Sequence, residues 1–428
     1  MSLACLALAT APSRGAAGQD FGGIGQAPQY SRGFNTAVRE RPHPEWAPFD
    51  IDLDGLTLKP QLNITSLFTD NEKFATTGAR SDESFRIQPA LSLDADGSRD
   101  GFGLQAFAAR TEYVRSSEDN STEYGGAATG HLDVRHDLSI DLRVDDQHLV
   151  LSRADPDVPV DTLAPVEFER QDFRATIIQT LPTIQLQGVF ALRNEDYDTA
   201  PLPQGAVYDA SGRNGTYLSY SGRVSYGVSP AVAVFVGALY GQGFRPREND
   251  EDQDSQGVNF AGGVNFDLTR LARGELALGY LRQSYSTPNT PADSGFAFSA
   301  SVEYFPTQLT TVSLTGSRQA APSSVAGSPG GIGLSGSVTV DHELLRNLIV
   351  SAGVTAGQVQ YRSYFVTGDN APGNRTDVSY GATLAASYLM NRLVSLDLQY
   401  SYADDRSTDA LRRSYSADRL AVTLRLTR

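Results

Sequence analysis

Five histidines, at positions 43, 131, 136, 148 and 342, are the first residues whose chemistry suggests a metal site or acid–base catalysis. His131, His136 and His148 lie close together in the sequence, but spacings of five and twelve residues match no metal-ligand motif. The chain also lacks the Gly-x-Ser-x-Gly pattern that surrounds the serine nucleophile of many hydrolases. We therefore expect no catalytic site, no metal and no cofactor, and we expect the protein not to be an enzyme.

A second group of reactive side chains consists of carboxylates and arginines that alternate with apolar residues. Asp141, Arg143 and Asp145, for example, alternate with Leu142 and Val144. Successive side chains of a β-strand point to opposite faces, so this segment would present charge on one face and apolar groups on the other. A helix would distribute both kinds around its surface. The charges therefore form one continuous surface only if the segment is a strand.

The same alternation continues through most of the chain after residue 51. Apolar residues occupy alternate positions in segments such as 218–228, 378–390 and 394–402. Short connections alternate with long ones that are rich in Asp, Glu, Asn, Gly, Ser and Pro, such as 245–256. These connections predict about 18 strands. We expect the strands to begin near residues 55, 83, 102, 123, 138, 167, 184, 215, 231, 257, 274, 296, 309, 333, 348, 377, 393 and 415.

Long strands joined by short turns on one side and long loops on the other are typical of outer-membrane barrels. A propeller would show a blade motif at a fixed period, and sandwich strands average only about five or six residues. We therefore predict an all-β protein, a single antiparallel transmembrane β-barrel over residues 51–428. Its short turns would be periplasmic and its long loops extracellular.

The composition is compatible with this interpretation and excludes several others. The 428 residues carry a net charge of −15 and are 40% apolar. No apolar run approaches the roughly 20 residues of a transmembrane helix, and a pI of 4.8 argues against a nucleic-acid partner. The single cysteine, Cys5, excludes a disulfide framework.

Residues 1–50 lack the alternating pattern. The apolar run at 2–11 resembles the core of a signal peptide, so we assign residues 1–18 to such a segment, truncated if the true start codon lies upstream. Residues 19–50 are rich in Gly, Pro, Gln and Arg and predict an irregular periplasmic arm. This arm is either a proline-stiffened linker or a segment that docks on the barrel.

If the apolar rows face lipid, the charged rows face a wet lumen. A charge facing lipid at the bilayer midplane would cost about 2–4 kcal/mol, which a lumen avoids. The charges would form a salt-bridge network that stiffens the wall, a track that binds sugars or selects ions, or both. The residues expected to line the lumen are Asp133, Arg135, Asp141, Arg143, Asp145, Arg170, Asp172, Arg174, Arg193, Glu195, Arg223 and Asp397.

Five segments, taken in order, resemble one known family of outer-membrane proteins. They are Arg-Pro-His-Pro-Glu-Trp at 41–46, Asn-Glu-Asp-Tyr-Asp at 194–198, Gly-Tyr-Leu-Arg-Gln-Ser-Tyr at 279–285, Asp-His-Glu-Leu-Leu-Arg-Asn at 341–347 and Tyr-Leu-Met-Asn-Arg at 388–392. With these segments, residues 37–428 resemble the putative β-barrel porin 2 family. The resemblance implies an 18-stranded barrel, and some members of the family are encoded with polysaccharide-synthesis genes.

The resemblance further implies a channel for a secreted polysaccharide. We therefore expect the outer-membrane part of an exopolysaccharide export translocon, located in the outer membrane of a Gram-negative bacterium. The expected partners are outer-membrane lipid, the barrel assembly machinery, a periplasmic polysaccharide-export protein and the polysaccharide in the lumen. Two alternatives remain, a general or small-solute porin and a structural or surface barrel with a plugged lumen.

Overall fold

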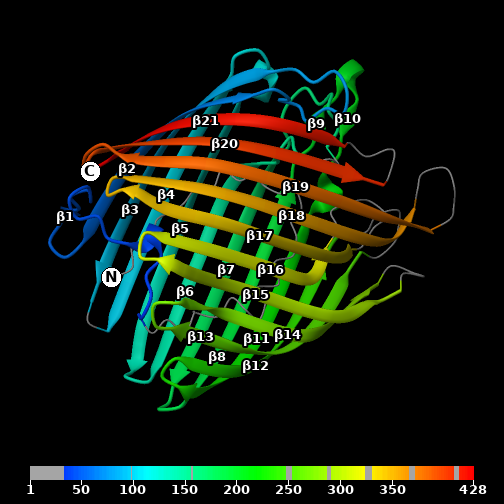
Figure 1. Cartoon of the computed structure of the whole chain (residues 1–428). Helices are drawn as coiled ribbons and strands as arrows, with labels where there is room; N and C mark the ends of the chain where they lie inside the picture. The colour runs from blue at the N-terminus through cyan, green and yellow to red at the C-terminus, as the bar shows by residue number, and fades with distance from the viewer. Residues whose placement is uncertain are drawn as a thin grey trace.

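Eighteen long antiparallel strands close into a single barrel (Figure 1). The computed structural model describes residues 33–97, 99–155, 158–246, 253–286, 291–322, 330–365, 372–408 and 414–428. The segment assigned to a signal peptide, residues 1–18, and the first part of the arm lie outside these residues. In the described part of the chain, no helix is long and apolar enough to cross a membrane.

The strands follow one another around the barrel in chain order. They are β2 (Thr57–Thr69), β3 (Asp82–Asp96), β4 (Asp100–Tyr113), β5 (Ser121–Arg135), β6 (Leu138–Val150), β7 (Glu167–Thr180), β8 (Ile184–Tyr197), β11 (Gly215–Ser229), β12 (Val232–Phe244), β13 (Ser255–Leu268), β14 (Ala272–Tyr285), β15 (Asp293–Thr307), β16 (Thr310–Pro322), β17 (Gly330–Leu345), β18 (Leu348–Phe365), β19 (Pro372–Leu389), β20 (Val394–Ser407) and β21 (Tyr415–Thr427).

Small elements lie outside the wall. The two-residue strand β1 (Ile51–Asp52) pairs with β2, and β9 (Ala200–Pro201) pairs with β10 (Val207–Tyr208) in the connection that follows β8. Four short 3-10 turns complete the described elements: η1 (Val38–Glu40), η2 (Ser117–Asp119), η3 (Pro203–Gly205) and η4 (Ser211–Arg213).

The first and last long strands close the barrel. Strand β2 pairs with β21 in a continuous register that runs from Gln61 opposite Thr427 to Thr69 opposite Arg419. Closure gives every strand two neighbours, so no row of backbone amides and carbonyls is left for lipid, which offers no hydrogen bonds.

The strand starts expected from the sequence agree with those observed. The starts at 138, 167, 184, 215, 348 and 415 coincide with the first residues of β6, β7, β8, β11, β18 and β21. The largest difference is at β19, expected near 377, which begins at Pro372. Strand β17 likewise begins at Gly330, three residues before the expected start near 333. Backbone pairing extends these hairpins past the point where the apolar alternation ends.

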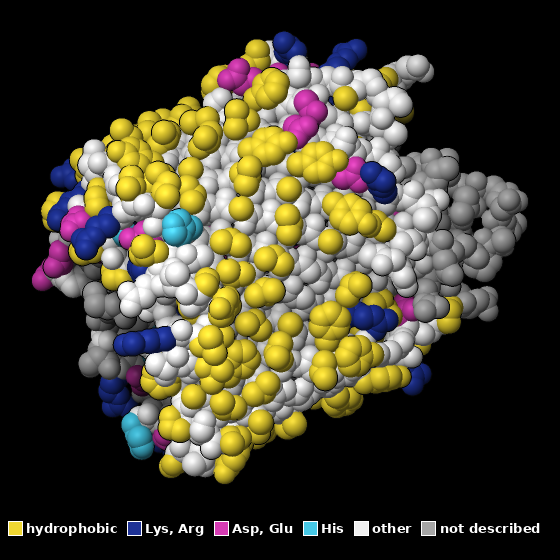
Figure 2. Space-filling view, viewed as in Figure 1, with side chains coloured by type: hydrophobic (Ala, Val, Ile, Leu, Met, Phe, Trp, Pro, Cys, Tyr) yellow, Lys and Arg dark blue, Asp and Glu magenta, His cyan; other side chains and the backbone are white. Residues whose placement is uncertain are grey.

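The apolar rows form the outer surface. Figure 2 shows hydrophobic side chains spread over the outside of the wall, with charged side chains gathered mainly towards its ends. Val236 and Leu278 are each 63% exposed. Tyrosines of the apolar rows, at 226, 380, 388, 400 and 402, are also exposed. A contiguous apolar surface of this extent needs a covering partner, and in a barrel that partner is the bilayer.

Candidate functional site

The charged residues predicted on β5–β8 lie in rows on one side of the sheet, because each residue faces its partner on the next strand. One row contains His131, Asp141 and Thr176, and the next contains Thr129, Arg143 and Arg174. The rows beyond contain Ala127, Asp145, Asp172 and Arg193, and then Gly125, Gln147, Arg170 and Glu195. The alternate positions carry exposed apolar side chains such as Leu142 and Val144, so the charged side is the lumen.

Most of these charges are paired within the wall. The pairs are Arg143 Nε with Asp145 Oδ2 (2.8 Å), Arg170 Nε with Glu195 Oε1 (3.0 Å), Arg193 Nε with Asp172 Oδ1 (2.7 Å), Arg223 Nη2 with Glu275 Oε2 (2.7 Å) and Arg425 Nη2 with Asp397 Oδ2 (3.2 Å). A salt-bridge network of the kind expected from the sequence is therefore present.

The Arg223 pair is the most enclosed of these contacts. Both guanidinium nitrogens Nη1 and Nη2 donate to Glu275, which lies three strands away on β14. The guanidinium also lies 3.5 Å from the centroid of the Phe235 ring, and Asn265 Nδ2 donates to Glu275 at 3.3 Å. Arg223, Glu275, Phe235 and Asn265 are all buried. The sequence analysis did not identify Glu275 as a site residue. Period-two alternation predicts which face of the sheet Glu275 occupies, but it cannot show that its partner is Arg223, three strands away.

Three of the predicted residues are placed differently from the paired ones. Arg135 lies at the short turn after β5, where its Nε is 3.5 Å from Asp137 Oδ1, because the β5–β6 register shifts just before it. Asp133 and Asp141 both contact His131, at 3.3 Å and 2.7 Å. In the part of the chain that the structure describes, no group of His, Cys, Asp and Glu residues could hold a metal ion.

Arg174 is the exception among the arginines of this wall. It lies directly opposite Arg143, and its strand neighbour Asp172 is engaged by Arg193. Within the described ranges, Arg174 forms no hydrogen bond or ion pair. Its charge is therefore available to a ligand in the lumen.

The described part of the arm, residues 33–50, docks at the periplasmic mouth. Asn35 Nδ2 donates to Asp267 Oδ1 at 2.6 Å, and the Val38 amide donates to Thr311 Oγ1 at 3.0 Å. Val38 is fully buried. Asp267 lies on β13 and Thr311 on β16, each beside a short turn.

Ion pairs extend the docking along the arm. Arg39 binds Asp341 at 2.7 Å, Arg41 binds Glu343 at 3.3 Å, and Glu40 accepts from Arg273 at 2.7 Å. Further along, the Glu45 carbonyl accepts from Arg392 Nε at 3.2 Å. The arm thus contacts residues from β13 to the β19–β20 turn. Of the two possibilities that the sequence left open, this segment docks on the barrel.

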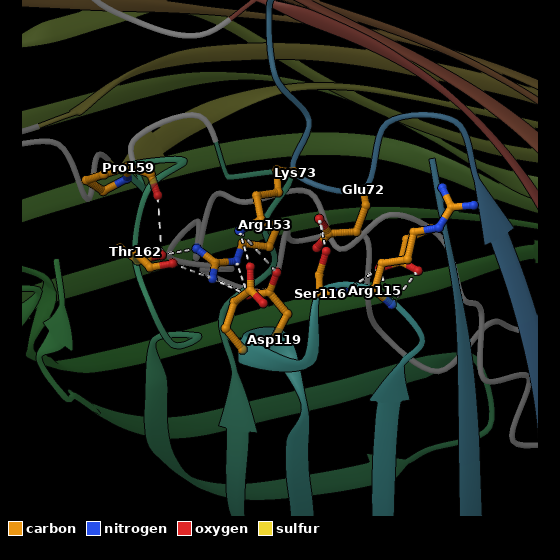
Figure 3. Close-up of polar contacts among 10 residues, drawn as sticks. Glu72, Lys73, Arg115, Ser116, Asp119, Arg153, Pro159 and Thr162 are labelled. Atoms are coloured by element: carbon orange, nitrogen blue, oxygen red, sulfur yellow. Dashed lines mark hydrogen bonds and ion pairs between the residues drawn. The ribbon is translucent and has the colours of Figure 1, made fainter. Parts of the chain in front are cut away.

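At the opposite end, extracellular loops are joined through a buried polar cluster (Figure 3). Arg153, in the loop after β6, donates to Asp119 on η2 and to Thr162. Lys73 Nζ binds Glu118 Oε1 at 2.8 Å, and Ser116 Oγ donates to Glu72 Oε2 at 3.2 Å.

An apolar cluster packs the loop after β6 against a strand on another part of the barrel mouth. Ala154 packs with Phe74 and Ala417, and Ala417 belongs to β21, on the other side of β2–β5. Arg213 Nη1, in the loop after β8, binds Asp155 Oδ2 at 2.8 Å. Both mouths of the lumen are therefore narrowed by ordered segments.

The surroundings of Glu72 favour the protonated form of its carboxyl group. Burial raises the pKa of the Glu72 carboxyl to about 8, and the adjacent Asp119 carboxyl adds to the shift. Two carboxylates this close cannot both ionise without strong repulsion.

A closed antiparallel barrel with an apolar exterior, a charged interior and unequal connections defines the class of outer-membrane channels. The family comparison agrees: the model of the putative beta-barrel porin 2 family matches residues 44–428. The chain belongs to this family and lies in the outer membrane. Membership indicates a channel and not an enzyme.

Two solved outer-membrane proteins of low sequence identity are similar to the chain. The outer-membrane protein OpdK of Pseudomonas aeruginosa is 13% identical, with 87% of this chain and 99% of that chain covered and a TM-score of 0.47. OccAB3 of Acinetobacter baumannii is 12% identical, with 88% and 100% covered and a TM-score of 0.46. At these values the likeness says nothing about what passes through the channel. No curated protein matches the chain.

Proposed function

We propose that this channel is the outer-membrane conduit of an exopolysaccharide exporter. The observation that carries the proposal is the ladder of paired charges along β5–β8, from Glu195 near the extracellular end to Asp141 near the periplasmic end. Sugar hydroxyls can donate to the carboxylates and accept from the guanidinium groups. Repeated weak contacts favour entry without trapping the polymer, as conduction requires.

The proposed partners follow from the proposal of an exopolysaccharide conduit. A periplasmic polysaccharide-export protein would meet the short-turn side, where Arg346 forms an exposed ion pair with Glu45 of the docked arm. Outer-membrane lipid would cover the apolar exterior. The barrel assembly machinery would receive the chain through its C-terminal strand, β21.

Gene deletion is the direct test of the conduit. We expect an in-frame deletion to abolish secreted polysaccharide and to leave polymer in the periplasm. Re-expression of the wild-type chain should restore secretion, which controls for effects on neighbouring genes. Normal secretion by the deletion strain would reject the proposal.

A small-solute porin is the second candidate, and the narrowing of both mouths favours it. The arm on one side and the loop cluster on the other reduce the cross-section available to a polymer. Swelling of liposomes that contain the purified barrel separates the candidates: rapid entry of mono- and disaccharides together with normal secretion in the deletion strain favours the porin. A plugged structural barrel would admit no sugar.

A further inference from the structure

The lumen wall contains a hollow of about 320 Å³ near the periplasmic end of β3–β7. Its polar lining consists of Asp94, Thr129, His131, Asp141, Arg143, Arg174 and Thr176. A side chain at Gly103 would fill it, because a Cβ there would come within 2.7 Å of Thr129 Oγ1 and 3.1 Å of Asp94 Oδ1. The hollow falls at the lower end of the range for small-molecule sites, about 300–1,000 Å³.

The acidic groups of this hollow already have side-chain partners. Asp94 accepts from Lys59 Nζ at 3.0 Å, and Asp141 contacts His131 Nδ1 at 2.7 Å. On the next row, Asp145 is held by Arg143.

Of the two arginines in the hollow, Arg143 is paired with Asp145, whereas Arg174 has no ion-pair partner among the described residues. Arg143 and Arg174 lie directly opposite each other on β6 and β7. Like charges in this arrangement destabilise a sheet, because opposite Cβ atoms are only about 5 Å apart. Arg193 on β8 takes Asp172, the carboxylate nearest to Arg174 along β7. The small Ala191, opposite Arg174 on the other side, leaves its guanidinium open to the lumen.

An anion between the two guanidinium groups would relieve this repulsion. A carboxylate fits best, because the planar guanidinium fork matches its two oxygens. The Thr129 and Thr176 hydroxyls and the Asp141 carboxylate lie around the same space and can bind hydroxyl groups of a ligand. The lining therefore combines recognition of one carboxylate with recognition of several hydroxyls.

We propose that this hollow binds sugar acids, so that the substrate of the channel is a hexuronate or a polymer containing hexuronate residues. The proposal deepens the proposed function, since it names the class of sugar, and it rests on that function only for the polymer. Binding at the hollow itself is measurable without transport.

The test uses the full barrel in detergent micelles, with D-glucuronate as the probe and ligand-observed NMR titration as the readout. D-glucose lacks the carboxylate and acetate lacks the hydroxyls, so these two compounds separate the elements of recognition. We expect glucuronate to bind more tightly than either compound. Arg174→Gln should weaken glucuronate binding about tenfold or more, since a hydrogen bond to a charged group contributes roughly 1.5–3 kcal/mol.

Arg110→Gln is the matched control, because Arg110 lies on the outward face of β4 and its change of charge is the same. Heat-dependent migration on a gel verifies that each variant is folded. Arg174→Lys keeps the charge without the fork and should bind with intermediate affinity. Equal binding of glucose or acetate, or equal effects of Arg174→Gln and Arg110→Gln, would overturn the proposal. The two experiments are independent. Secretion by the deletion strain tests the conduit, whereas the titration tests binding at the hollow.

Discussion

At the scale of single residues, the Arg223–Glu275 pair illustrates how charged side chains are buried in the lumen wall. Its two side chains are only 8% and 9% exposed, and Phe235 and Asn265 surround them. Such a pair is weak evidence for stability as a whole, but removal of one partner leaves an uncompensated buried charge. The wall is therefore sensitive to single substitutions here.

Glu275→Ala should lower the free energy of unfolding by about 3 kcal/mol, the usual cost of breaking a buried ion pair from one side. Urea unfolding in lipid vesicles measures the change. The control is Glu112→Ala in the exposed Arg110–Glu112 pair, whose loss should cost no more than about 1 kcal/mol. Equal costs for the two variants would show that the Arg223 site is open to solvent.

Glu72 gives the extracellular loop cluster a dependence on pH. The carboxyl has an ordinary pKa of 4.5 and a pKa of about 8 in the folded loops, so the folded form binds more protons between these values. The loops should therefore lose stability as the pH rises from about 4.5 through about 8, and change little above that. Deprotonation places a negative charge beside Asp119.

Limited trypsin digestion between pH 7 and pH 9.5 measures this effect. Glu72→Gln is neutral at every pH, so the ratio of the wild-type rate to the Glu72→Gln rate cancels the pH response of the protease. We expect this ratio to rise with pH. A ratio that stays constant would mean that Glu72 is already ionised at neutral pH.

At the scale of elements, the docked arm controls the periplasmic mouth. Arg39 and Arg41 hold it to Asp341 and Glu343, on the lumen side of β17. The double substitution of both arginines by alanine should release the arm and raise the conductance of the channel in planar bilayers. Arg406→Ala, in the exposed Arg406–Asp404 pair within β20, does not contact the arm, so it is the control and should leave the conductance unchanged. Equal conductance of all three proteins would place the narrowest point elsewhere.

The register of β20 is testable with two adjacent cysteines. Asp397 contacts Arg425 inside the lumen, whereas Leu398 is 45% exposed on the outer face. In vesicles, a charged thiol reagent should label Asp397→Cys through the aqueous lumen and should not reach Leu398→Cys, which faces lipid. The opposite labelling pattern would invert the assignment of the two faces.

At the scale of the whole molecule, closure between β2 and β21 decides whether a barrel exists. Removal of residues 415–428 would leave β2 and β20 as open edges, which lipid cannot satisfy. The truncated chain should fail to form a folded species that migrates differently before and after heating on a gel. Leu426→Ala, which keeps the backbone pairing, is the control and should still fold.

Sequence alone was sufficient for the class of fold and the positions of most strands. Alternation is a local property, because each strand must present apolar groups to lipid and polar groups to water regardless of its neighbours. The starts of β6, β7 and β8 were therefore predicted from their own residues, and so was the shared face of Asp141, Arg143 and Asp145. The start of β19 was less well placed, because outside the bilayer hydrogen bonds extend the strand without an apolar pattern.

The pairing of the charges was decided only by the tertiary structure. Partners such as Arg223 and Glu275 are 52 residues apart, and Arg39 and Asp341 are 302 apart, so their contact depends on closure, register and the path of the arm. The sequence identified Arg174 as one of several lumen arginines. Only the registers of β6, β7 and β8 distinguish it from the others, because they place Arg143 opposite it and direct Asp172 to Arg193.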